Sequence, residues 1–486
     1  MRGEAASFGV DLVLLLGGFG VLSAIGIRPG GLLSALGMAG LAYLAGSAVV
    51  PLALTLLLVV GIPFTLETFL VVVLLCVAVG IWRGWGSFTW RWDIGANRQG
   101  PWRSWPVDTW VIAAFVAAIA AFAVVGLLNA LVEPMVSGDG WTIWARKAQI
   151  LTEHDSLWSG FFHNPVYAFS HLDYPLQIPI FEAIHSRAAG AFEAPALLSH
   201  LWLLLVAFIW AMAYVAHALG RLRPVVWAPI LLLVATAPGV WQQANGAVDL
   251  PMAMFACVGA LAAAIWLRDD DFRVLALGAI MLAAAANTKN EGTAAAIAAL
   301  VALGLMVLVR KLDWRAFTIA GGFVIVFGIV PWRLWLSHEH IKGDVRTGEV
   351  LHPSYLIHQF DRVWPTLKAI GGQLSEQGQW SYLVPLAAVF VLAALVSGLG
   401  RRIAVFYLVA FLLTLASFIF VYWVSTYELS WYLETSVSRT VTVLVLFCAA
   451  ALVHLSGVFL ASLGKPLVGS RSLDVDKASR SRSSDP

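Results

Sequence analysis

The sequence predicts an all-α protein that crosses a membrane about thirteen times, with interfacial helices in its first long external loop. Two observations carry this prediction. Of 486 residues, 60% are hydrophobic and only 12% are charged, whereas a soluble globular domain carries about 25% charged residues. Apolar runs long enough to cross a bilayer, roughly 20 residues each, recur along the chain. The net charge of +2 is too small to indicate a nucleic-acid partner.

The apolar runs give the order of the expected membrane-spanning segments. They lie near 9–27, 33–60, 66–82, 107–131, 195–219, 224–242, 250–267, 274–288, 293–309, 316–336, 380–399, 403–424 and 440–460. The cysteines at positions 76, 257 and 448 all fall inside these runs, so they offer no spacing for a disulfide framework or a cysteine metal site.

The distribution of Lys and Arg predicts the orientation. Short loops on the cytoplasmic side of a membrane carry an excess of these residues. Alternate loops hold the bases, namely Arg28; Arg83, Arg91, Arg98 and Arg103; Arg221 and Arg223; Arg268 and Arg273; Arg310, Lys311 and Arg315; Arg401 and Arg402; and the tail from Lys465 to Arg482. All lie on one side if the N-terminus is outside. The long loops 132–194 and 337–379 are then extracytoplasmic.

The chain divides into three regions. Residues 1–106 are expected to form additional N-terminal transmembrane helices, and residues 107–460 a transmembrane core that carries both long external loops. Residues 461–486 are rich in Ser, Arg and Asp and nearly free of apolar residues, so we expect a disordered cytoplasmic tail.

The stretch VSGDGWTIWARKAQIL, residues 136–151, opens the first long external loop. Read as a helix over 140–153, it has two faces. The apolar face holds Trp141, Trp144, Ala145, Ala148 and Leu151, and the polar face holds Arg146, Gln149 and Glu153, with Lys147 near the border. This pattern is typical of a helix in the membrane interface. Asp139 precedes it, which places a carboxylate at the membrane surface; alternatively, Asp139 is simply the helix N-cap.

Four further segments follow in order: HLDYPLQIPIFEA (171–183), GAVDLPMAM (246–254), NTKNEG (287–292) and SWYLETSVSRT (430–440). Together with the opening stretch, they resemble membrane glycosyltransferases of the C-fold (GT-C) superfamily. The likeness is greatest to the bacterial branch that includes the aminoarabinose transferase of lipid A and the rhizobial lipopolysaccharide galacturonosyltransferases. It covers residues 107 to 445, so the first three spans look like an N-terminal addition.

The resemblance implies an enzyme that moves a sugar from a polyprenyl-phosphate donor to a glycan, lipid or protein acceptor. The site would face the extracytoplasmic side of the bacterial inner membrane. In this family an acid in the first external loop is the catalytic base, which matches Asp139, and a second acid at the start of a later span matches Asp249. Gly140 departs from the pattern, because a charged or aromatic residue commonly follows the first acid. Membrane lipids are further partners; nucleic acid is not expected.

The residue types suit this chemistry. A carboxylate can take the proton of a sugar hydroxyl, and the leaving phosphate needs fixed cations. Lys289, Arg439 and Lys147 are the candidates for holding the phosphate, with a bidentate grip from Arg439. The remaining candidates for contact with the substrate are His171, Tyr174, Glu291 and Trp431.

Most of these residues also have a purely structural interpretation. The alternatives are lipid-phosphate binding by Arg146 and Lys147, a turn with an aromatic anchor at 173–175, a helix start at Asp249, a Lys289–Glu291 ion pair, and extension of Arg439 to lipid headgroups.

The sequence gives little support for a metal and leaves other functions open. His171, His338 and His340 could bind a divalent cation, but an H-x-H pair without a defined third ligand is a weak signal. No other cofactor is expected. An O-antigen ligase-like polymer transferase shares the donor and the external loop but lacks the early acidic loop. A transporter of lipid-linked sugars should show charges near mid-membrane and repeat symmetry, and a non-catalytic scaffold would not require these external charges.

Overall fold

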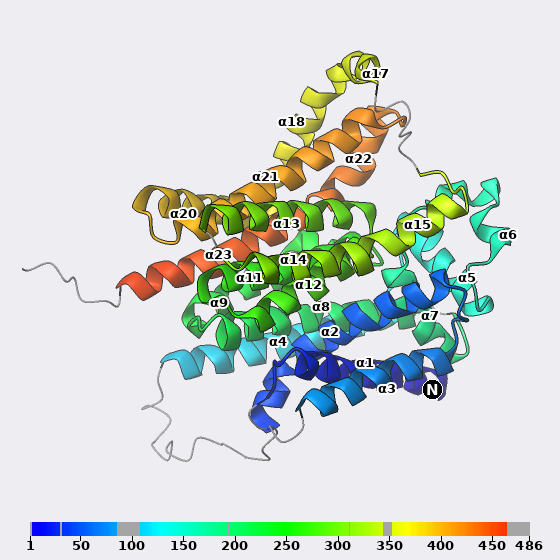
Figure 1. Cartoon of the computed structure of the whole chain (residues 1–486), viewed down its shortest axis with the longest axis horizontal. Coiled ribbons are helices and arrows are strands. Elements are labelled where there is room, and N and C mark those ends of the chain that lie inside the picture. Colours follow the sequence, from blue (N-terminus) through cyan, green and yellow to red (C-terminus); the bar gives the residue numbers. More distant parts are fainter. Residues whose placement is uncertain are drawn as a thin grey trace, which may run out of the picture.

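The computed structural model describes residues 2–29, 32–84, 107–192, 194–310, 312–343 and 352–463. Within these ranges all of the regular secondary structure is helical, and there is no strand (Figure 1). The predicted all-α membrane fold is confirmed. Of the predicted disordered tail, residues 461–463 are instead the last residues of a helix, and the remainder lies outside the described residues. Several of the loop bases on which the orientation depends also lie outside them.

Ten helical segments of the described chain are long and apolar enough to cross a membrane. They belong to α1 (Arg2–Ala24), α2 (Leu32–Val59), α3 (Leu66–Gly84), α4 (Val107–Val132), α8 (Ala194–Tyr214) with η4 (Val215–Leu219), α11 (Asp249–Asp269), α13 (Asn290–Arg310), α14 (Trp314–Phe323) with η5 (Val324–Ile329) and α15 (Val330–His338), α21 (Arg401–Val424), and α22 (Leu429–Thr440) with α23 (Thr442–Leu463).

Three further apolar helices are shorter. They are α9 (Pro224–Thr236), α12 (Phe272–Ala286) and α20 (Leu383–Ser397), with 13, 15 and 15 residues. A bilayer span takes about 20 residues, so these helices fall short of one by length alone. Every predicted span coincides with a helix, but the count of thirteen is not confirmed.

Helix α11 is the centre of the bundle. All its residues from Asp249 to Leu267 are buried, and it packs against α8, α12, α13 and α23. Small residues let it approach α12 closely: a Cβ added to Gly278 would lie 3.2 Å from the carbonyl oxygen of Gly259. Because neighbouring helices pack against α11 along its length, the position of the Asp249 carboxylate in its first turn is fixed.

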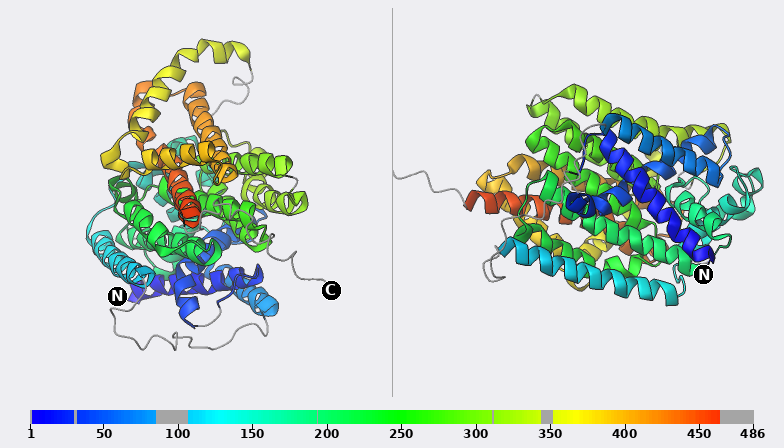
Figure 2. Two further views of the ribbon diagram at one scale, coloured as in Figure 1. Left: turned by 90° about the vertical axis from the view of Figure 1, so that its left-hand side faces the viewer. Right: turned by 90° about the horizontal axis from the view of Figure 1, so that it is seen from below.

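The N-terminal helices form one side of the bundle. Helix α1 packs against α2, α3 and α7 (Gln177–Ala189), while α2 packs against α7, α8 and α12. Figure 2 shows these helices, in blue, on the side opposite the yellow arm made by α17 (Pro353–His358) and α18 (Val363–Leu374). The N-terminal helices therefore contact the long loop 132–194 through α7.

The long loop 132–194 folds into short helices at one end of the bundle (Figure 1): η2 (Gly140–Ala145), α5 (Arg146–Glu153), α6 (Ser159–Phe162) and η3 (Pro165–Ser170), followed by α7. The helix predicted over 140–153 forms, but its first turn is a π-helix. A π-helical turn advances by a smaller angle per residue than an α-helical turn, so it changes which residues share a face. Trp141, predicted on the apolar face, is 44% exposed, and Lys147, predicted at the border, is 1% exposed. The predicted faces are therefore partly wrong.

Candidate functional site

A cavity of about 450 Å³ opens where several helices begin. Its wall combines the loop before η2, the turn at 171–174, the connection from α10 (Pro238–Gln243) to α11, the turn before α13, and α22. Of the residues predicted from sequence, those that line it are Asp139, His171, Tyr174, Lys289, Glu291, Trp431 and Arg439. The fold thus gathers residues from segments far apart in the chain.

Asp139 and Arg439 form an ion pair on the cavity wall. Nη1 of Arg439 donates a hydrogen bond of 2.5 Å to Oδ2 of Asp139, and the two side chains are 21% and 38% exposed. Asp139 makes no capping bond. Ser137 instead accepts a hydrogen bond from the backbone amide of Gly140 through its Oγ, at 3.0 Å. The N-cap interpretation of Asp139 is therefore wrong, and Arg439 is held at the cavity rather than extended to headgroups.

Behind this pair lies a second set of charges. Nζ of Lys289 is 2.7 Å from Oδ1 of Asp249 and 3.1 Å from Oε1 of Glu291. Burial alone would lower the pKa of Lys289, but the negative charges of Asp249 and Glu291 outweigh it and raise that pKa above its usual value. Lys289 is thus a permanent cation in the cavity wall, and the predicted Lys289–Glu291 pair is present.

Asp249 links the two cations. It is 1% exposed and does not line the cavity, while its Oδ2 lies 3.9 Å from Nη1 of Arg439. Its position fits an indirect role: it orients Lys289 and Arg439 and does not contact a ligand in the cavity. We call Asp139, Asp249, Lys289, Glu291 and Arg439 the charge cluster. With three acids and two bases, its formal charge is −1.

Lys147 is placed differently from expectation. Its Nζ donates hydrogen bonds to the carbonyl oxygens of His171, at 2.6 Å, and Tyr174, at 3.0 Å. It also lies 5.6 Å from the ring centroid of Trp144. It does not line the cavity, so it is not placed to contact a phosphate there. Its role is to fix the 171–174 turn from behind.

That turn presents two rings to the cavity. The ring of Tyr174 stacks between those of His171, at 4.8 Å, and Trp144, at 5.5 Å. Asp173 supports the turn: its carboxylate accepts a hydrogen bond from Nδ2 of Asn290 at 2.8 Å. The turn interpretation of 173–175 fits this geometry, and the turn still brings Tyr174 to the cavity.

Several cavity residues were missed by the sequence analysis. They are mainly amides and aromatics: Gln242, Gln243, Asn245, Gln379, Tyr427 and Tyr432. Asn245 accepts a hydrogen bond from the amide of Val136 at 2.8 Å, and Gln379 donates one of 2.6 Å to Gln242. These bonds tie the loops 132–194 and 337–379 to α10 and the connection that follows it. The run WQQANG, polar between two apolar runs, was the available signal.

The three histidines considered as possible metal ligands, His171, His338 and His340, do not form a ligand group among the described residues. Among the described residues, one group of three or more His, Cys, Asp or Glu side chains brings its ligand atoms within 4.8 Å of one another, and it is Asp11, His185 and His200. His338 is 84% exposed by side chain and lies 3.9 Å from its neighbour Glu339. His171, His338 and His340 therefore do not act as a set.

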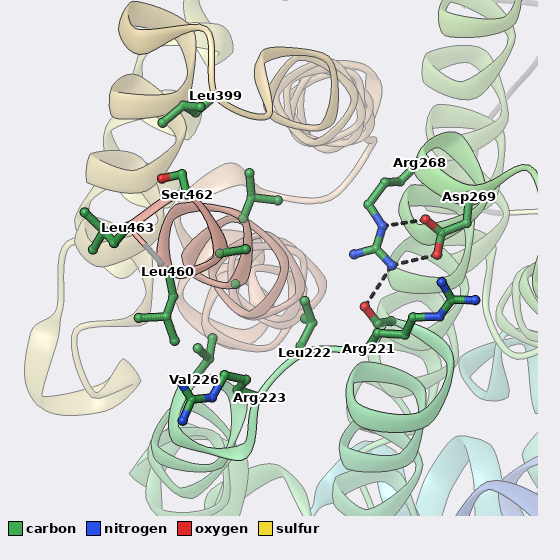
Figure 3. Close-up of a pocket in the computed structure, with 14 residues that line it drawn as sticks. Arg221, Leu222, Arg223, Val226, Arg268, Asp269, Leu399, Leu460, Ser462 and Leu463 are labelled. Atoms are coloured by element: carbon green, nitrogen blue, oxygen red, sulfur yellow. Dashed lines mark hydrogen bonds and ion pairs between the residues drawn. The ribbon is translucent and has the colours of Figure 1, made fainter. Parts of the chain in front are cut away.

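A larger pocket of about 720 Å³ lies at the other end of the bundle, lined by Arg221, Arg223 and Arg268 (Figure 3). Helix α11 runs from one cavity to the other, and its 21 residues span about 30 Å. Among the described residues that line this pocket there is no aromatic side chain, and the one carboxylate, that of Asp269, lies 2.7 Å from Nη2 of Arg268. The described part of its wall therefore offers neither a ring for stacking nor an available base.

No protein-family model, no curated protein and no solved structure matches this chain. The chemistry of the first cavity is nonetheless well defined. It combines a partly exposed carboxylate, two fixed cations and several aromatic rings. Such a site suits proton removal from a hydroxyl beside a bound anion.

Proposed function

We propose that this chain is a membrane glycosyltransferase that moves a sugar from a polyprenyl-phosphate donor to an acceptor hydroxyl. The observation that carries the proposal is the Asp139–Arg439 pair on the cavity wall, which joins residues 300 positions apart. A general base and an anion-binding guanidinium in contact are what this transfer needs. The resemblance of the surrounding motifs to the C-fold superfamily supports the same chemistry.

The pair suggests an exchange when the donor binds. Arg439 is engaged by Asp139, and the charge cluster as a whole is negative. A donor phosphate would replace Asp139 on Arg439, because a guanidinium binds phosphate oxygens bidentately. Asp139 is then released beside the donor, and Lys289 and Arg439 both face the phosphate. Donor binding would thus prepare the base.

The transfer step balances with these groups. The acceptor O–H loses its proton to the carboxylate of Asp139 as its oxygen forms a bond to the anomeric carbon of the sugar. The bond from that carbon to the phosphate oxygen breaks, and its electron pair leaves with the phosphate. Arg439 and Lys289 stabilise the charge that develops there. General-base help of this kind is worth about 10²–10⁴-fold in rate.

The level of the cavity fits a lipid-linked substrate. Helices α11, α13 and α23 begin beside it, at Asp249, Asn290 and Thr442. A polyprenyl phosphate has its charge at the membrane boundary and its tail below, so its headgroup belongs at this depth. Trp431, which is 54% exposed at the rim, offers a ring on which a sugar can stack.

The arginines at the opposite end support the extracytoplasmic placement. Arg221 and Arg223 line the larger pocket there with Arg268, and Arg401 and Arg402 line another beside it. Cytoplasmic loops carry such an excess of bases. We therefore place the cavity on the extracytoplasmic face, in a bacterial inner membrane as the resemblance implies.

The test is a transfer assay in proteoliposomes. Purified chain is supplied with polyprenyl-phosphate sugars and an envelope lipid extract from the source cell, and new glycosidic products are identified by mass spectrometry. Asp139→Asn should lower product formation by about 10²-fold or more while the chain remains folded. Glu153→Gln, a matched change on the exposed face of α5, should leave it unchanged.

Two results would refute the proposal. One is near-normal transfer by the Asp139→Asn variant, because the carboxylate could not then be the base. The other is passage of the lipid-linked sugar across the vesicle without any new glycosidic bond, which would favour a transporter.

A further inference from the structure

Three side chains with metal-binding chemistry meet inside the bundle, apart from the charge cluster. Asp11 comes from α1, His185 from α7 and His200 from α8. Nε2 of His185 lies 3.0 Å from Oδ1 of Asp11, and Nδ1 of His200 lies 2.8 Å from Oδ2. All three residues are buried, at 8%, 0% and 1% exposure. Neither the cavity nor the larger pocket includes them.

The outer nitrogen of each imidazole has a partner of its own. Nδ1 of His185 lies 2.7 Å from the carbonyl oxygen of Phe181, which can only accept a hydrogen bond. Nε2 of His200 lies 2.7 Å from Oγ of Ser7. Metal-ligating histidines almost always donate their second N–H to such a group, which fixes the ring and turns the other nitrogen's lone pair toward the ion. Both rings here are held in that manner.

The two imidazoles are directed at the two oxygens of one carboxylate. Both nitrogens of His185 face acceptors, the carbonyl of Phe181 and the carboxylate of Asp11. The ring of His185 stacks on that of His200 at 3.8 Å, so the two imidazoles lie side by side at the carboxylate. A divalent cation held there would accept a lone pair from each imidazole and have the carboxylate as its anionic ligand. Tyr43 completes the surroundings by donating a hydrogen bond of 2.6 Å to Oδ1 of Asp11.

We propose that Asp11, His185 and His200 bind a divalent transition-metal ion and thereby fasten the N-terminal helices to the rest of the bundle. Two imidazoles and one carboxylate are a donor set that Zn²⁺ favours. The ligands connect α1 to α7 and α8, and α7 in turn packs on α5. This role for the N-terminal region does not depend on the proposed transfer reaction.

The first test is the metal content of the full chain. The protein is purified in detergent through an affinity tag without histidine, incubated with Zn²⁺, freed of excess ion by gel filtration and analysed by mass spectrometry for metals. We expect about one ion per chain, and Co²⁺ in its place should give the visible absorption of an imidazole-bound site. A monodisperse wild-type chain that retains no ion overturns the proposal.

Variants then locate the ion. Asp11→Asn and His200→Gln should each lose it, whereas His338→Gln, a change at an exposed histidine, should retain it. A chelator should lower the unfolding temperature of the wild type by several degrees and leave that of the two cluster variants unchanged. Retention of the ion by folded Asp11→Asn and His200→Gln chains would show that it binds elsewhere, which contradicts the assignment.

Discussion

Replacement of Asp139 by asparagine should strengthen donor binding while it abolishes transfer. In the exchange described above, Asp139 competes with the donor phosphate for Arg439, to which it is bonded at 2.5 Å. Asp139→Asn removes the competing charge and keeps the shape of the side chain. Arg439→Ala removes the guanidinium for which Asp139 and the donor phosphate compete. The two variants should therefore change the affinity for the donor in opposite directions.

The magnitudes follow from the exposure of the pair. The side chains of Arg439 and Asp139 are 21% and 38% exposed, so solvent screens their attraction, and we take about 1 kcal/mol, the upper end of the range for exposed pairs. Asp139→Asn should therefore tighten binding about 5-fold. Arg439→Ala removes charge-assisted hydrogen bonds worth about 1.5–3 kcal/mol, which weakens binding about 10- to 150-fold.

The assay is direct binding of a polyprenyl phosphate to the purified chain in nanodiscs, followed by native mass spectrometry. Arg439→Lys keeps the charge but not the bidentate grip, so it should recover only part of the affinity lost in Arg439→Ala. Glu153→Gln is the neutral control. Equal weakening in Asp139→Asn and Arg439→Ala would refute the exchange, because the carboxylate would then be helping to hold the phosphate.

Three further predictions concern the surrounding structure. Lys147→Met leaves the carbonyls of His171 and Tyr174 without this donor, so the free energy of unfolding should fall by about 2–4 kcal/mol, measured by denaturant titration; an unchanged value would contradict the supporting role of Lys147. Burial raises the pKa of the Glu182 carboxyl from 4.5 to about 8, so the folded state binds more protons than the unfolded state between these values and stability should fall as pH rises from about 5 to 8. In the Glu182→Gln variant the unfolding temperature should fall less over this pH range than in the wild type. An equal fall in both proteins would show that Glu182 is not the group responsible. The side chain of Asp155 is 57% exposed, so a cysteine introduced by Asp155→Cys should react with an impermeant thiol reagent added outside the cell. Labelling only from the cytoplasm would show that the predicted membrane orientation is wrong.

The sequence predicted much of the site because of where its residues lie along the chain. Asp139 and Arg439 are 300 positions apart, but both stand where a span meets the same end of the bundle. The charges of Asp249, Lys289 and Glu291 lie at span ends in the same way. Alternation of spans therefore brings such residues to one depth, and the topology alone was enough to group them.

Other features depend on geometry that the residue pattern does not carry. A π-helical turn over Gly140–Ala145 rotates the residues that follow, so Lys147 is buried where α-helical spacing placed it at a border. Asp11, His185 and His200 lie on three different helices. No local spacing links them, and only the packing of α1, α7 and α8 on one another brings them together.

The proposed function requires a polyprenyl phosphate to bind Arg439 in the cavity, in place of Asp139. A cryo-electron microscopy map of the full chain in nanodiscs with bound polyprenyl phosphate tests this placement. We expect the phosphate within hydrogen-bonding distance of Arg439 and Lys289, with the carboxylate of Asp139 released from Arg439 and free to face the acceptor. Headgroup density among Arg221, Arg223 and Arg268 at the other end of the bundle, with the Asp139–Arg439 pair intact, would contradict it.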